Sequence, residues 1–211
     1  MLHKDPFIVA PETFALIQQL QSLAELNEFY LVGGTSLALQ MGHRNSIDID
    51  LFSQIFFTGQ SLAEILKRYM TVRIDVAVNG TLLSHINNIK VDFICHNHPY
   101  VKEPIKEEGI TFLSMQDIAA MKLNAIIQSG QRLKDFIDIY FLLRHFSVND
   151  MLHFFSVKYD YISPAMALKA LVYFDDIDET IDPPQLVKPL SLQKIKERIT
   201  DAVLSSKKVF R

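Results

Sequence analysis

Residues 29–52 of this 211-residue chain read FYLVGGTSLALQMGHRNSIDIDLF. The apolar run at 29–32 is typical of a short strand, and apolar residues return at helical spacing over 35–41. Gly33 and Gly34 therefore lie at a predicted strand-to-helix turn. The free amides and the dipole of a helix N-terminus attract anions, so this turn is a candidate phosphate site.

The end of the same stretch alternates in character over residues 46–52 and predicts a half-buried strand. Ile47, Ile49 and Leu51 share one face, which turns Asp48 and Asp50 to the other. Two carboxylates in this arrangement can jointly bind a hard divalent cation. The same spacing also arises by chance, on strand edges that resist aggregation and in metal-dependent glycosyltransferases.

Neither motif is specific alone, because glycines at such turns usually serve backbone geometry. Together they describe one working unit, in which Gly33 and Gly34 let the chain approach a triphosphate while the carboxylate pair holds a bridging metal ion. Thr35 and Ser36 are candidates for hydroxyl contacts to phosphate. The combination favours a nucleotide site.

Three strand-like runs follow at 72–78, 81–86 and 89–95, separated by Asn79-Gly80 and Asn87-Asn88. Both dipeptides favour the positive φ of tight turns, so the runs predict an antiparallel meander. Asp92 faces away from the apolar residues of the last run. It is a candidate third carboxylate that coordinates a metal ion and accepts a proton from an attacking hydroxyl; the alternative is an exposed strand aspartate.

The second half of the chain has helical patterning. Ser114 and Asp117 form a capping-box spacing that opens a predicted helix over 115–129. Further helices are expected at 134–144, 164–174 and 190–204, in addition to 12–26 and 60–69 in the first half. We predict a catalytic domain at residues 1–112 and a helical domain at 113–211.

Lys122 lies on an apolar helix face, so it either neutralises a triphosphate or extends its stem over apolar surface with its amine in water. Asp135 and Asp138 share a face of the next helix. They can hold Lys122 or Arg132 in place, reach the nucleotide or the metal ion, or simply stabilise the N-terminus of their own helix.

Composition narrows the function class. Apolar residues make up 49% and charged residues 21%, as in folded soluble proteins, and no run can span a bilayer, so we expect no membrane contact and a cytoplasmic protein. Cys95 is the only cysteine, which excludes an internal disulfide. Histidine spacings that bind zinc and a Walker-type phosphate loop are absent from the sequence.

The formal net charge is −3, and the charges are unevenly placed. Residues 175–182 contain five acidic residues and no basic one, which is typical of a solvated linker. Residues 188–211 contain seven basic residues and two acidic ones. This basic tail is a candidate surface for phosphate or for an acidic protein.

The chain resembles the AbiEii/AbiGii-type toxin nucleotidyltransferases of bacterial abortive-infection and toxin–antitoxin systems, within the DNA-polymerase-β-like superfamily. The resemblance covers about residues 29–143. It rests on Val-Gly-Gly-Thr at 32–35, twelve further residues, Asp-Ile-Asp at 48–50, Lys122, and Lys-Asp-Phe-Ile-Asp at 134–138.

The resemblance implies an α+β fold, in which a polymerase-β-like nucleotidyltransferase mixed sheet flanked by helices precedes a C-terminal helical bundle. It also implies that NTP and Mg²⁺ bind between the two. The expected roles are a phosphate turn at Gly33, Gly34 and Thr35, metal ligands at Asp48, Asp50 and Asp92, and nucleotide contacts from the remaining candidates. Those candidates are Ser36, Lys122, Asp135 and Asp138.

By the same resemblance, we expect transfer of NMP from NTP to an acceptor hydroxyl, with RNA and in particular tRNA as acceptor and a cognate antitoxin as partner. Two alternatives remain open. One is a small-molecule nucleotidyltransferase of the antibiotic-modifying kind, and the other is a non-catalytic binding protein that retains the fold.

Overall fold

The computed structural model describes residues 2–210, which form two compact units. Unit 1 contains the chain up to His98 together with Pro104–Leu113, and unit 2 contains Pro99–Glu103 together with the chain from Ser114 onward. The division into domains at residue 112 stays a prediction. Within the described residues, no helix has both the length and the apolar character needed to cross a membrane.

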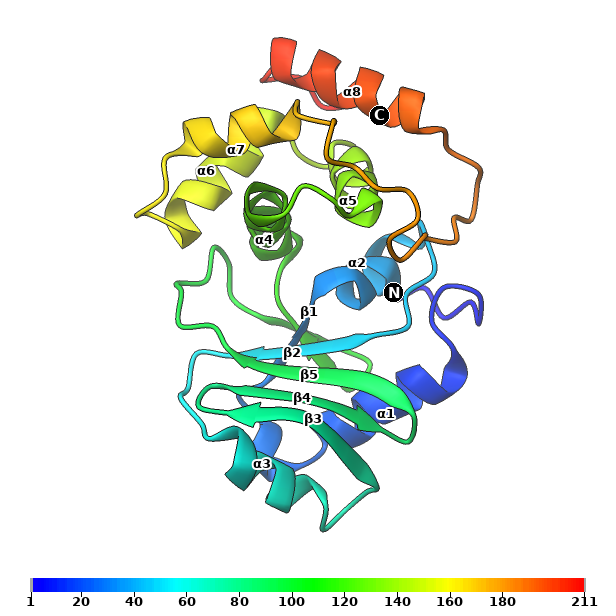
Figure 1. The fold of residues 1–211 in the computed structure, drawn as a ribbon, viewed down its shortest axis with the longest axis vertical. Coiled ribbons are helices and arrows are strands. Elements are labelled where there is room, and N and C mark those ends of the chain that lie inside the picture. Colours follow the sequence, from blue (N-terminus) through cyan, green and yellow to red (C-terminus); the bar gives the residue numbers. More distant parts are fainter. Residues whose placement is uncertain (1, 211) are drawn as a thin grey trace. The chain divides into compact units, whose positions relative to one another are not determined.

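Unit 1 is built on a seven-stranded sheet with the order β3-β4-β5-β2-β1-β7-β6 (Figure 1). The β2–β5 and β1–β7 pairs are parallel and the other pairs are antiparallel, so the sheet is mixed, as expected for the predicted α+β class. The strands are β1 (Tyr30–Val32), β2 (Ile49–Ser53), β3 (Val72–Val78), β4 (Thr81–Ile86), β5 (Ile89–Cys95), β6 (Ile105–Glu107) and β7 (Ile110–Phe112).

Three α-helices and a 3₁₀ turn accompany this sheet: α1 (Pro11–Gln21), η1 (Ala24–Leu26), α2 (Gly33–Met41) and α3 (Gly59–Leu66). Pro11 opens α1 at a position where its missing N–H costs nothing, and the Thr58 side chain caps α3 by accepting from the Ser61 amide. Apolar side chains of α1 and α3 share a core with Ile49 and Val91. Since strand side chains alternate, Asp50 and Asp92 belong to the other face.

The meander β3–β4–β5 has the bounds expected from its alternating pattern. Asn87 and Asn88, with φ of 51° and 66°, both adopt the left-handed conformation that a two-residue hairpin turn requires. In the first turn only Gly80 does so, with φ of 73°.

Strand β2 begins later than the alternation of residues 46–52 suggested. It starts at Ile49, so Asp48 precedes the strand and Ile47 is 61% exposed instead of sharing a buried face. Local hydrogen bonds replace strand pairing here, because the Ser46 amide donates to the Ile8 carbonyl and the Thr35 hydroxyl donates to the Asp48 carbonyl.

Unit 2 is helical: α4 packs against α5, α6 and α7, and α8 packs on α5 (Figure 1). The helix α6 was not expected, although Ser147 and Asp150 form a full capping box at its start, with the same spacing as Ser114 and Asp117. The helices are α4 (Met115–Gln128), α5 (Leu133–Leu142), α6 (Val148–Lys158), α7 (Pro164–Leu171) and α8 (Leu192–Leu204).

A buried ion pair joins α4 to α6 within unit 2. The Lys158 amine lies 2.8 Å from Asp117 Oδ1, and both side chains are fully shielded from solvent. Asp117 also accepts from the amides of Val101 and Lys102 at 2.9 and 3.2 Å and from the Ser114 hydroxyl at 2.6 Å. These bonds fasten residues 99–103 to the helical unit.

Candidate active site

The glycine turn begins α2 directly after β1, and its shape depends on neighbouring side chains of unit 1. Gly33 has φ of 70°, a left-handed conformation, and a Cβ there would collide with the Asp50 carboxylate. A Cβ at Gly34 would collide with the Arg44 guanidinium. Both glycines are thus required for the close approach of protein groups, and their contact with phosphate stays a prediction.

Thr35 and Ser36 are each 1% exposed and take part in hydrogen bonds inside unit 1. Thr35 Oγ1 donates to the Asp48 carbonyl and lies 2.9 Å from Ser46 Oγ. Ser36 Oγ accepts from Gln40 at 3.0 Å. In this arrangement Thr35 holds the segment that carries Asp48, and the predicted contacts of both hydroxyls with phosphate remain to be tested.

The strand pairing brings two of the three candidate carboxylates side by side. Asp50 on β2 and Asp92 on β5 are Cα partners in parallel register, and Asp48 lies two residues before Asp50. The side chains of Asp50 and Asp92 belong to the face opposite the α1–α3 core. The Gly33 turn touches the same carboxylate of Asp50, so the turn and the acidic residues form one locality.

Lys90, which spacing alone did not single out, lies among these acids. Its amine is 3.1 Å from Asp92 Oδ2, and the side chain is 46% exposed. Partial burial lowers the pKa of the Lys90 amine, but the hydrogen bond to Asp92 and the charges of Asp92, Asp48 and Asp50 outweigh it and raise that pKa above its ordinary value. The amine therefore offsets part of the negative charge of the acidic locality.

Arg44 is a second residue that the sequence analysis missed. It is only 3% exposed, its guanidinium lies against Gly34, and its Nη1 donates to the Asn45 carbonyl at 2.9 Å. A buried guanidinium beside a helix N-terminus reinforces a positive local potential. The basic pair His43-Arg44 before the predicted strand was the available signal.

The carboxylate oxygens of this locality suit a cation, although they do not form a complete metal site. Asp92 Oδ1 is buried and has no hydrogen-bond partner among residues 2–210. A buried carboxylate oxygen without a donor is unfavourable, and a bound cation would satisfy it. In the same part of the chain, no three histidine, cysteine, aspartate or glutamate side chains form a ready cluster for a metal ion. Coordination by Asp48, Asp50 and Asp92 together stays a prediction.

In unit 2 the structure excludes one of the two alternatives for Lys122. Its amine is buried and lies 2.8 Å from Asp135 Oδ1 and 2.7 Å from Asp138 Oδ2, so it does not extend into water. Arg132 also pairs with Asp135, at 2.8 Å. The two acids therefore hold Lys122 and Arg132 in place, and a direct nucleotide contact by any of the four is untested.

Two side chains of the basic tail make cation–π contacts within unit 2. Arg198 stacks over the Tyr140 ring at 3.8 Å, and Lys196 lies 5.6 Å from the Phe174 ring centre. These cation–π contacts occupy two of the charges that were candidates for a phosphate surface.

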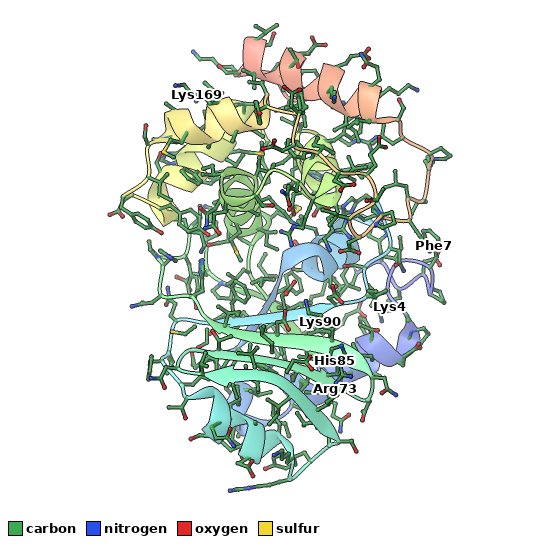
Figure 2. The ribbon with its side chains drawn as sticks, viewed as in Figure 1. Lys4, Phe7, Arg73, His85, Lys90 and Lys169 are labelled. Carbon is green, nitrogen blue, oxygen red and sulfur yellow. The ribbon has the colours of Figure 1, made fainter. Side chains whose placement is uncertain are left out.

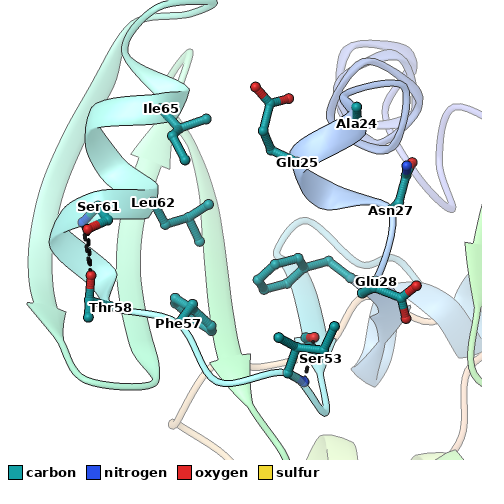
Figure 3. A pocket seen from close by; sticks show the side chains of 12 residues that line it. Ala24, Glu25, Asn27, Glu28, Ser53, Phe57, Thr58, Ser61, Leu62 and Ile65 are labelled. Atoms are coloured by element: carbon teal, nitrogen blue, oxygen red, sulfur yellow. Dashed lines mark hydrogen bonds between the residues drawn. The ribbon is translucent and has the colours of Figure 1, made fainter.

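Unit 1 also contains an apolar hollow of about 310 Å³ that none of the candidate site residues lines (Figure 3). Leu62 and Ile65 extend into it from α3, towards the segment that carries Glu25 and Asn27 (Figure 3). Its apolar walls distinguish it from the acidic locality.

Comparison with known protein families identifies one model, described as the nucleotidyl transferase AbiEii toxin of type IV toxin–antitoxin systems, which matches residues 15–206. An uncharacterised protein of Aquifex aeolicus (strain VF5) is 33% identical over 171 residues, which cover 78% of this chain and 82% of that protein. The family match spans most of both units.

Solved structures share the fold at low sequence identity. MenT4, a nucleotidyltransferase toxin from Mycobacterium tuberculosis H37Rv, superposes with a TM-score of 0.62 at 14% identity, over 92% of this chain and 82% of that one. A protein of H. pylori described as a candidate nucleotidyltransferase gives 0.58 at 16% identity, over 93% and 92%. The glycine turn and the paired acids thus occur in a fold shared with these proteins, and the chain belongs to the AbiEii family of toxin nucleotidyltransferases.

Proposed function

We propose that the protein transfers NMP from an NTP to a hydroxyl group of RNA, with tRNA as the leading acceptor, in a reaction that depends on Mg²⁺. Asp92 Oδ1, buried without a hydrogen-bond donor beside Asp50, is the observation that carries this proposal. We place the reaction in the cytoplasm, and the type IV toxin–antitoxin family supports a cognate antitoxin as partner.

The chemistry is an in-line substitution at the α-phosphorus. The acceptor oxygen forms the new bond to phosphorus, the bond to the β-phosphate bridging oxygen breaks, and pyrophosphate leaves with that electron pair. Asp92, whose carboxylate is not saturated by hydrogen bonds from the described residues, would accept the hydroxyl proton. Mg²⁺, held by Asp48, Asp50 and Asp92, would offset charge on the attacking and leaving oxygens.

The other candidate residues would orient the nucleotide. The α2 N-terminus supplies amides at Gly34 and Thr35 for phosphate oxygens. Asp50, in contact with Gly33, ties the metal ligands to that turn. Lys122, fixed by Asp135 and Asp138, would steady the triphosphate with an amine whose position is already set.

A labelling experiment tests the proposal. The wild type, Asp50→Ala and the matched control Asp160→Ala, an exposed acid of unit 2, are incubated with Mg²⁺, each α-³²P-labelled NTP and cellular RNA. We expect label in RNA with the wild type and the control, and loss of at least about 100-fold with Asp50→Ala. No transfer by the wild type across NTPs and acceptors would refute the proposal.

The acceptor fraction separates the alternatives. Label in a small molecule instead of RNA would identify an enzyme of the antibiotic-modifying kind. For a binding protein without catalysis, calorimetry with nucleotide and Mg²⁺ would give equal affinities for the wild type and Asp50→Ala.

A further inference from the structure

A row of basic side chains crosses the face of the unit 1 sheet that carries the acids. Arg73 on β3 is the Cα partner of His85 on β4, and His85 is the Cα partner of Lys90 on β5. Cross-strand partners point to the same face, so the three bases form a line from the sheet edge inward (Figure 2). We call Arg73, His85 and Lys90 the basic row.

The basic row leads to the proposed catalytic acids. Lys90 is two residues before Asp92 on β5, so the two side chains share a face and their Cα atoms are about 7 Å apart along the strand. Their direct contact at 3.1 Å confirms that they meet. A chain bound along the row would reach the carboxylates without leaving this face of the sheet.

The outer end of the row opens into a polar hollow of about 620 Å³. The left-handed turn at Asn87 and Asn88 brings two side-chain amides to its wall. Every lining side chain can donate a hydrogen bond to an anionic oxygen. The lining residues are Thr71, Arg73, His85, Asn87 and Asn88.

Asp75 fixes the orientation of Arg73 and His85. It is the bulge residue of β3, and it contacts Arg73 Nε at 3.4 Å and His85 Nδ1 at 2.7 Å. Arg73 Nη2 also lies 2.8 Å from His85 Nδ1. Basic side chains that are held in place lose less conformational entropy on binding an anion than mobile ones do. Arg73 remains 69% exposed and therefore accessible.

Two aliphatic side chains, Val76 and Leu83, lie directly beside the basic row. Val76, Leu83 and Asp92 are successive cross-strand partners, and Val76 is 39% exposed. A phosphate group alone gains no binding energy from contact with an aliphatic surface. A single nucleic-acid strand presents phosphates and unstacked bases together, so its phosphates would contact the basic row while a base packs against Val76 and Leu83.

We infer that the basic row and its hollow bind the phosphodiester backbone of the acceptor strand and direct its terminal hydroxyl to Asp92. This inference rests on the proposed function for the identity of the reaction. The binding surface itself follows from the register of β3, β4 and β5.

The test uses substitutions at the outer end of the row, away from the acids. Anisotropy of a fluorescent single-stranded RNA of about 15 nucleotides is measured with the full chain at several salt concentrations. The variants are Arg73→Gln, Arg73→Lys, Asp75→Asn and the control Arg68→Gln, which removes an exposed charge just after α3. Mn²⁺ affinity, followed in parallel, reports on the acids alone.

Arg73→Gln should weaken RNA binding about five- to tenfold and lower the slope of log affinity against log salt by about 0.7, the value for one lost single-strand phosphate contact. Arg73→Lys should retain most of the affinity. Asp75→Asn keeps a side-chain oxygen that can accept from Arg73 and His85 but removes the negative charge beside them, so it should tighten binding severalfold.

Equal salt slopes for Arg73→Gln and Arg68→Gln, or weakening by Asp75→Asn, would overturn the inference. If RNA is labelled by wild type and Arg73→Gln with the same KM for RNA, the inference fails while the proposed function stands. If RNA binding depends on Arg73 but no label is transferred, the binding surface stands and the proposed function fails. Label in a small molecule or a protein, without RNA binding, would overturn the inference alone.

Discussion

Asp92 of unit 1 and Asp117 of unit 2 are aspartates of the same chain in contrasting environments. Asp117 is fully buried and receives hydrogen bonds from two amides, a hydroxyl and the Lys158 amine. One oxygen of Asp92 pairs with the half-exposed Lys90 amine, and its other oxygen has no hydrogen-bond partner among residues 2–210. We call Asp117 a completed acid, because both of its oxygens have hydrogen-bond donors, and Asp92 an incomplete acid, because one of its oxygens has none among the described residues. A completed acid contributes to the architecture, whereas an incomplete acid can still bind a cation or a proton donor.

The largest expected effect comes from removing the ion-pair partner of the completed acid Asp117. Lys158→Met leaves Asp117 buried without its ammonium partner and should lower the free energy of unfolding by about 3–5 kcal/mol, as measured by urea denaturation. The matched control, Lys169→Met, changes an exposed lysine of α7 and should cost less than about 0.5 kcal/mol. A loss below about 1 kcal/mol in Lys158→Met would mean that the pair contributes little.

Asp92→Asn tests the incomplete acid. Mn²⁺ affinity should fall at least about tenfold, while the free energy of unfolding stays within about 0.5 kcal/mol of the wild type, because little is bonded to the carboxylate that is lost. Calorimetry and urea denaturation give the two values, with Asp160→Asn as control. Unchanged Mn²⁺ affinity together with marked destabilisation would show that Asp92 acts as Asp117 does.

A smaller effect concerns how Asp50 is positioned. Gly33→Ala and Gly109→Ala both place a side chain at positive φ, 70° and 79°, which costs about 1 kcal/mol each. Only at Gly33 does the new methyl group collide with a neighbour, Asp50; at Gly109 the nearest atom is 3.7 Å away. Gly33→Ala should therefore lose about 1–2 kcal/mol more in thermal unfolding. Equal losses would argue against tight packing at the turn.

The smallest effect concerns Asp150, another completed acid of unit 2. Hydrogen bonds from the Ser147 hydroxyl and amide lower the pKa of Asp150, so the stabilisation is present above the ordinary aspartate pKa and is lost as pH falls through the lower folded value. Ser147→Ala should cost about 1 kcal/mol at pH 7 and less near pH 3. Unfolding at both pH values measures the difference, and a pH-independent cost would contradict this cause.

Local patterns predicted most of the fold because its elements have local causes. Alternation and two turn dipeptides were enough for the β3–β4–β5 meander. The β6–β7 hairpin was missed, since its three-residue strands carry too little periodicity to recognise, whereas the equally short β1 is marked by the Gly33-Gly34 turn that follows it. Helix α6 was missed despite its Ser147 cap, a signal that was present and not used.

The candidate site was less accessible to sequence reasoning. Spacing singled out Asp48 and Asp50, but only the pairing register places Asp92 beside Asp50 and Lys90 against Asp92. Arg44 was missed because its approach to Gly34 depends on a loop rather than on a periodic element. The basic row depends on the β3–β4 register and the β4–β5 register together, and local sequence patterns do not specify how strands are aligned.

The excursion of residues 99–103 into the helical unit has a practical consequence. The backbone changes units after His98, after Glu103 and after Leu113, so no single cut yields two intact halves. A fragment that starts at Ser114 would lack the Val101 and Lys102 amides that Asp117 needs. Truncation or domain exchange should therefore fail where point substitution succeeds, and during synthesis this short segment must await helices that emerge from the ribosome later.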